Sequence, residues 1–244
     1  MSGRTLCRSV TDTRTTSRYE LECIPGRRSA RKFQLAVRGV SFCSCYIYSP
    51  RAEGGAAERS RLLCARLKSG DPEWLPRYAG QVFQQASPQR QFPGLFARDV
   101  VLVPVPGSAP SEGTPWAAER LAIALTGVGL AGAVLVCLQR RFAVRKSATA
   151  LSGERPTVQE HFDSFVAIDG SPHLPRRILL VDDVVTKGRT LLAAAARLHE
   201  AFPNTDVRAF ALVRTMGFLP KLHSMLEPCE GIIRWAGGDA RREP

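Results

Sequence analysis

An uninterrupted apolar run that ends in two carboxylates constrains the fold of this chain more than any other feature. The run Ile178–Val181 consists of isoleucine, leucine and valine, and Asp182 and Asp183 follow it directly. A strand without polar alternation is typical of a parallel sheet that is covered on both faces. We therefore predict a buried strand over Arg177–Asp183 within an α/β fold.

A helix is predicted directly after this strand, and the same alternation recurs along the chain. Apolar residues at helical spacing place this helix over Lys187–Phe202. Further strands are predicted over Asp99–Val105, Ala133–Leu138, Phe162–Ile168 and Val207–Val213. Further helices are predicted over Ala57–Lys68, Glu73–Gln84 and Pro115–Thr126. Such alternation predicts a mostly parallel central sheet flanked by helices.

The first 55 residues have a different character. Residues 1–30 are polar and rich in arginine, which predicts an irregular arm. The segments Lys32–Val37 and Val40–Tyr48 flank Arg38-Gly39 and alternate enough to predict a β-hairpin. We expect residues 1–55 to form this arm and a small hairpin or hood region, and residues 56–244 to form the main α/β domain.

Composition limits the function classes. No apolar run approaches the roughly 18–20 residues that a membrane helix needs, and the first twenty residues hold no apolar segment typical of a secretory signal. The seven cysteines form no C-x-x-C pair, which argues against a structural zinc site. We therefore expect a cytoplasmic protein without a membrane partner. The net charge of +12 favours an anionic partner such as a nucleotide, a pyrophosphate or a nucleic acid.

The segment after the acid pair has the chemistry of a phosphate cradle. Backbone N–H groups at a helix N-terminus attract anions, and a glycine lets the backbone approach a phosphate closely. The residues expected to bind the phosphate are Val184, Val185, Thr186, Lys187, Gly188, Arg189 and Thr190.

Two adjacent carboxylates would repel a bare phosphate, so Asp182 and Asp183 must face another group. Ribose hydroxyls would satisfy them, and so would a hydrated Mg²⁺ that bridges to a diphosphate. A phosphate cradle beside an acid pair that binds hydroxyls describes a site for a phosphorylated sugar.

The pattern Asp-Asp-x-x-Thr-x-Gly-x-Thr over Asp182–Thr190 resembles the signature of type I phosphoribosyltransferases. The resemblance implies that the acid pair holds the ribose hydroxyls and that the following loop holds the 5′-phosphate. It further implies phosphoribosyl pyrophosphate as ligand, Mg²⁺ as cofactor, held directly or indirectly by the acid pair, and a homodimer. Lys187 and Arg189 depart from the commonest form of the motif and are expected to add positive charge at the phosphate.

A second element of that family precedes the motif. The strand Val100–Val105 leads into a predicted pyrophosphate loop, which consists of Val105, Pro106, Gly107 and Ser108. Together with Ala65–Asp71 and Leu151–Phe165, this strand makes the chain similar to the ComF/GntX branch, amidophosphoribosyltransferase-like proteins associated with competence and DNA uptake. The chain departs from that branch in having no four-cysteine zinc ribbon and no Arg-Gly-Phe-Asn-Gln segment after the strand.

Three functions follow from these features. The first is transfer of the phosphoribosyl group to a nitrogen nucleophile with release of pyrophosphate. A basic lid over Gln139–Arg155 would then exclude water, and its candidate residues are Arg145, Lys146 and Arg155. The second is a nucleotide sensor that binds the ligand without turnover. Because the departures bear on catalysis, the motif supports ligand binding more strongly than the reaction.

The third function is single-stranded nucleic-acid binding through the early arginines. The bases would stack on aromatic side chains of the predicted hairpin, namely Phe33, Phe42, Tyr46 and Tyr48. A place in the core is the favoured interpretation of these aromatics. His161 is expected to be a surface or packed histidine without a chemical role.

Overall fold

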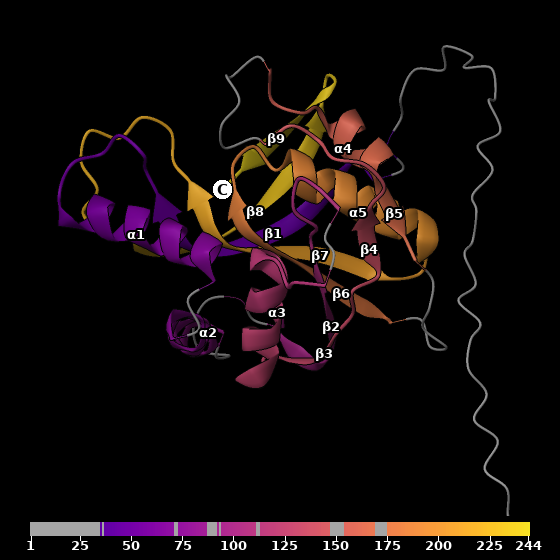
Figure 1. The fold of residues 1–244 in the computed structure, drawn as a ribbon, viewed down its shortest axis with the longest axis horizontal. Coiled ribbons are helices and arrows are strands. Elements are labelled where there is room, and N and C mark those ends of the chain that lie inside the picture. Colours follow the sequence, from indigo (N-terminus) through magenta and orange to yellow (C-terminus); the bar gives the residue numbers. More distant parts are fainter. Residues whose placement is uncertain are drawn as a thin grey trace, which may run out of the picture. The chain divides into compact units, whose positions relative to one another are not determined.

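The computed structural model describes residues 35, 37–70, 73–86, 92, 94–110, 113–146, 154–168 and 175–244. A seven-stranded sheet with the order β3-β2-β6-β7-β1-β8-β9 forms its centre (Figure 1). The strands are β1 (Gly39–Tyr48), β2 (Ala97–Pro104), β3 (Ala131–Val134), β6 (Arg177–Val185), β7 (Asp206–Thr215), β8 (Leu226–Ala236) and β9 (Asp239–Glu243). The first five strands of this order are parallel, and only β8 and β9 are antiparallel to their neighbours. The predicted mostly parallel sheet is confirmed.

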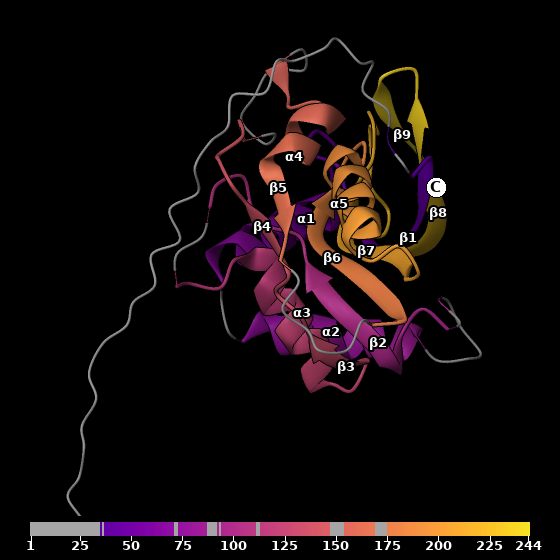
Figure 2. The ribbon, with the colours of Figure 1, turned by 90° about the vertical axis from the view of Figure 1, so that its right-hand side faces the viewer.

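Helices cover both faces of the sheet (Figure 2). The helices are α1 (Gly55–Ser69), α2 (Trp74–Gln85), α3 (Ala117–Gly127), α4 (Val158–Ser164) and α5 (Arg189–Ala201). Buried leucines of α1, α2 and α3 share one hydrophobic cluster with Leu179 and Val181 of β6. The helix α5 packs against β6, β7 and β1 on the other face, beside α4. The residues Ile178–Val181 are buried because β6 lies between these two layers.

The predicted N-terminal hairpin is wrong. The strand β1 pairs in parallel with β7 on one side and antiparallel with β8 on the other, and the described residues Leu35 and Val37 of the predicted partner segment belong to no strand. Alternation predicts a strand, but it does not identify the strand's partners. Residues 1–34 and 36, including the predicted arm and Phe33, lie outside the described residues. The predicted boundary after residue 55 falls within the compact unit Gln34–Pro244.

The strand predicted over Phe162–Ile168 is wrong in its first half. Thr157 and Glu160 form a capping box, in which each side chain bonds the backbone N–H of the other residue, and α4 follows. The strand β5 (Phe165–Ala167) begins only after this helix. It pairs with β4 (Leu138–Arg140) in a separate two-stranded sheet. The strand predicted over Ala133–Leu138 is therefore divided between the end of β3 and the start of β4.

The C-terminal strands β8 and β9 stand beside α5, as both views show (Figures 1 and 2). The Arg242 side chain of β9 donates to the backbone oxygens of Val185, at 3.2 Å, and Thr215, at 2.7 Å. Arg242 thereby ties the C-terminal strand to the carboxyl ends of β6 and β7. None of the described helices is long and apolar enough to cross a membrane.

Candidate functional site

The two predicted ligand-binding segments lie next to each other at the carboxyl edge of the sheet. The strand β2 is the direct neighbour of β6, and the Val105 N–H donates to the Val181 oxygen at 2.8 Å. This bond aligns the end of β2 with the residue that precedes Asp182. The loop Val105–Ser108 therefore starts beside the acid pair. Ligands bind at this edge in open parallel α/β sheets.

The two carboxylates of the acid pair lie in different surroundings, because successive side chains of a strand point to opposite faces of the sheet. Asp182 lies on the same face as Arg140 of β4, whereas Asp183 lies near Cys64 of α1. Burial and the adjacent Asp183 raise the pKa of Asp182 well above its ordinary value, and the positive charge of Arg140 offsets this only in part. A cation or a hydroxyl donor that reached Asp182 would favour its ionised form.

The predicted phosphate loop is shorter than expected. Val184 and Val185 belong to β6, where they pair with Val213 and Arg214 of β7. The N–H of Val184 donates to the Asp183 carboxylate at 2.8 Å. The loop proper is Thr186–Gly188, after which α5 begins. Among the described residues, no side chain caps the N-terminus of α5, so its first-turn N–H groups keep the capacity to bind an anion.

The structure gives a reason for Gly188 that the sequence analysis did not include. Its φ is +85°, in the left-handed region that favours glycine. An added Cβ would lie 2.7 Å from the Cδ1 and Cγ2 atoms of Ile233. The space beside the Gly188 Cα is therefore filled by a side chain of β8. The sequence shows the glycine but not this long-range contact.

The two cations of the loop are bound to an acid that the sequence analysis missed. Asp239 at the start of β9 accepts hydrogen bonds from Arg189 Nη2 at 2.7 Å and from Lys187 Nζ at 3.3 Å. These bonds lower the pKa of Asp239 to about 2, so its carboxylate is ionised at neutral pH. Asp239 therefore neutralises part of the charge that Lys187 and Arg189 were expected to offer to a phosphate.

The second missed feature is a buried polar cluster around Arg140. The Arg140 side chain donates to Gly107 O and Ser164 Oγ, and its Nη2 lies 3.1 Å from His161 Nδ1. The other ring nitrogen of His161, Nε2, lies 3.4 Å from Thr190 Oγ1. Burial and the charge of Arg140 lower the pKa of His161 to about 3, so the ring is neutral. The cluster connects the predicted pyrophosphate loop with the start of α5.

The predicted lid is described only at its two ends, because residues 147–153 lie outside the described part of the chain. Arg145 forms an exposed ion pair with Glu154 at 2.9 Å, and Lys146 is exposed. The backbone oxygen of Arg155 accepts a hydrogen bond from Arg189 at 3.1 Å. The segment therefore reaches the phosphate loop, while its role as a lid stays a prediction.

A pocket of about 240 Å³ lies against the outer side of the Val105–Ser108 loop. Pro106, Trp116 and Arg140 line it, among others. The Trp116 indole is fixed by a 2.7 Å hydrogen bond from Nε1 to Val105 O. None of the residues Asp182–Thr190 is among those that line this pocket, so it lies beside the Val105–Ser108 loop and not over the acid pair.

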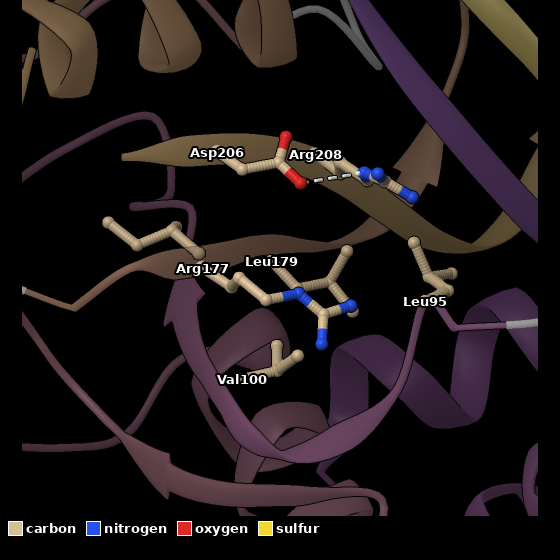
Figure 3. Close-up of a pocket in the computed structure, with 7 residues that line it drawn as sticks. Leu95, Val100, Arg177, Leu179, Asp206 and Arg208 are labelled. Carbon is tan, nitrogen blue, oxygen red and sulfur yellow. Dashed lines mark hydrogen bonds and ion pairs between the residues drawn. The ribbon is translucent and has the colours of Figure 1, made fainter. Parts of the chain in front are cut away.

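A second hollow lies at the opposite, amino end of β6 (Figure 3). It is bounded by Arg177, Val100 and the ion pair between Asp206 and Arg208. Its volume of about 10 Å³ leaves room for a single water. It is therefore unrelated to the candidate site.

The aromatic residues proposed to stack on bases belong to the core. Phe42 and Tyr46 of β1 are each 1% exposed, and Tyr48 packs against the same cluster as Tyr46. Buried rings cannot reach a nucleic acid without unfolding β1. The core interpretation is confirmed for Phe42 and Tyr46, whereas Tyr48 is partly buried at the margin of the core.

Among the described residues, no three histidine, cysteine, aspartate or glutamate side chains gather into a group that could hold a metal ion. No protein-family model matches this chain, and no curated protein matches it closely enough to count as a relative.

Proposed function

We propose that the chain has a type I phosphoribosyltransferase-like fold and binds phosphoribosyl pyrophosphate or another ribose 5-phosphate group at Asp182–Thr190. One observation carries the proposal. The acid pair lies near the carboxyl end of the central parallel strand β6, and the uncapped N-terminus of α5 follows it within six residues, beside the loop that follows β2. This arrangement places hydroxyl acceptors and anion donors at one edge of the sheet, and a phosphorylated ribose needs both.

Each part of the ligand would meet a different element. Asp182 and Asp183 would accept hydrogen bonds from the ribose hydroxyls, and the amides at the start of α5 would hold the 5′-phosphate. The loop Val105–Ser108 would face the pyrophosphate. Mg²⁺ fits this donor set, because it commonly binds through one or two carboxylates together with substrate phosphates. When bound, it would neutralise charge on the departing pyrophosphate.

The reaction that fits this site is displacement of pyrophosphate from the anomeric carbon by a nitrogen nucleophile. The bond from that carbon to the pyrophosphate oxygen breaks, and the bond to the acceptor nitrogen forms. The resemblance implies that the protein's share is to orient the two reactants and stabilise the leaving group, without a covalent bond to the protein.

Pyrophosphate release tests the reaction. The protein is incubated with phosphoribosyl pyrophosphate and Mg²⁺, together with ammonia, amines or nucleobases in turn. We expect release that depends on one class of acceptor and is lost in Asp183→Ala. If none of the acceptors gave release, the transferase reaction would be refuted.

A binding module without turnover is the second candidate, and the contacts of Asp239 favour it. The cations Lys187 and Arg189 are already engaged by this carboxylate, which lowers the positive charge available to a ligand. Calorimetric binding of phosphoribosyl pyrophosphate without pyrophosphate release would identify a sensor. Binding with release would exclude it.

A further inference from the structure

Arg140 is a buried cation whose partners are almost all neutral. Arg140 is 6% exposed. Its guanidinium donates to Gly107 O and Ser164 Oγ and contacts His161 Nδ1. The guanidinium carbon also lies 4.2 Å from the centre of the Phe165 ring. Within the described residues, no carboxylate forms an ion pair with it. Burying such a charge is unfavourable unless something compensates it. An anionic ligand beside Asp182 would supply the counter-charge.

The hydrogen bonds around Arg140 have a fixed direction. A guanidinium only donates, so His161 Nδ1 must accept and the ring proton must lie on Nε2. The Nε2–H faces Thr190 Oγ1 at 3.4 Å, and the Thr190 oxygen therefore accepts. The hydroxyl hydrogen of Thr190 is left to donate elsewhere. Thr190 lies in the first turn of α5, where the anion-binding amides are.

We propose that Arg140 and His161 are positioning residues, which form a hydrogen-bonded link that holds Gly107 of one ligand-binding loop and the Thr190 hydroxyl of the other in register. The inference rests on the proposed function, since both loops are assigned to one phosphoribosyl ligand. The link orients Thr190 so that its hydroxyl donates to the 5′-phosphate. Ser164 supports it by accepting from Arg140 and donating to His161 O at 2.7 Å.

Two conservative substitutions test the two hydrogen bonds of the His161 ring separately. An asparagine can replace the Nδ1 acceptor but does not reach Thr190. A glutamine can replace the Nε2 donor but leaves Arg140 without its acceptor. We expect His161→Asn to weaken binding of ribose 5-phosphate about fivefold, the effect of one neutral hydrogen bond, and His161→Gln to weaken it less, because the donor to Thr190 is kept. His223→Asn, at an exposed histidine, is the matched control.

A double-mutant cycle decides whether His161 acts through Thr190. Calorimetry with ribose 5-phosphate is run on the full chain, on His161→Asn, on Thr190→Val and on the double variant. We expect the His161→Asn effect to disappear in the Thr190→Val background, because the hydroxyl that it orients is gone. Independent, multiplying losses would overturn the link. If His161 only stabilised the fold, His161→Asn would lower the affinity for ribose 5-phosphate by the same factor with and without the Thr190 hydroxyl.

Failure of the proposed function and failure of this inference alone give different results. If the unsubstituted protein bound no ribose 5-phosphate, the proposed function would fail and the inference with it. If it bound normally and only the cycle gave independent losses, the inference alone would fail. Nitrogen NMR of the His161 ring needs no variant and adds a readout without ligand. We expect Nε2 to be protonated, and a proton on Nδ1 would overturn the link even if His161→Asn failed to fold.

Discussion

Replacing Gly188 with alanine tests the packing of the phosphate loop against β8. The new Cβ would lie within 2.8 Å of three side-chain atoms of Ile233, at a residue whose φ is +85°. The left-handed backbone costs an alanine about 1–2 kcal/mol, and overpacking a filled space adds about 1–3 kcal/mol. We therefore expect Gly188→Ala to lower the free energy of unfolding by about 2–5 kcal/mol.

Gly129→Ala is the matched control for the backbone contribution. Gly129 has a φ of +83°, and no atom within 4 Å would meet its Cβ. We expect Gly129→Ala to lose only the backbone contribution, about 1–2 kcal/mol. Urea unfolding of both variants, with the slope against denaturant unchanged, gives the difference. Equal losses in the two variants would refute the claim that Ile233 fills the space beside Gly188.

Three further predictions follow from single contacts. Asp239→Asn removes the carboxylate that forms ion pairs with Lys187 and Arg189. We therefore expect calorimetry at low salt to show several-fold tighter binding of ribose 5-phosphate. Weaker or unchanged affinity would contradict the charge argument. The raised pKa of Asp182 means that the folded protein loses stability as pH rises above the ordinary aspartate value of 3.8 towards the folded value. Asp182→Asn removes this loss, so we expect the variant to be more stable than the unsubstituted protein at neutral pH and equally stable well below pH 3.8. Denaturant unfolding at several pH values measures the difference, and a variant that was less stable at neutral pH would contradict the argument. Phe42→Ala is expected to lower the free energy of unfolding by about 3–5 kcal/mol, because Phe42 is 1% exposed. A stable variant that lost only affinity for single-stranded DNA would instead favour the nucleic-acid hypothesis.

The local features of the site could be predicted from the sequence because they depend on short-range periodicity. The apolar run before Asp182 and the helical spacing after Gly188 placed β6 and α5 to within a few residues. The resemblance implied that Val105–Ser108 belongs to the same site, but only the structure shows that β2 is the direct neighbour of β6. The end of β6 was misplaced by two residues, because β7 extends the pairing to Val185.

The remaining features depend on contacts between segments that are far apart in the sequence. Asp239 lies about fifty residues beyond the cations that it engages, and nothing near it indicates an acid of the site. Arg140 stands in a basic segment that is typical of an exposed loop, yet the pairing of β4 with β5 buries it. The helix that carries His161 did have a local signal, the Thr157 and Glu160 of its capping box.

Calorimetric titration with ribose 5-phosphate tests the central claim most directly. The experiment compares the unsubstituted protein with Asp183→Ala, and it uses ribose and inorganic phosphate as separate control ligands. The account predicts saturable binding of one ribose 5-phosphate per chain, much weaker binding of either fragment, and loss of binding in Asp183→Ala. Equal binding of ribose 5-phosphate by Asp183→Ala and the unsubstituted protein would contradict the assignment of this site.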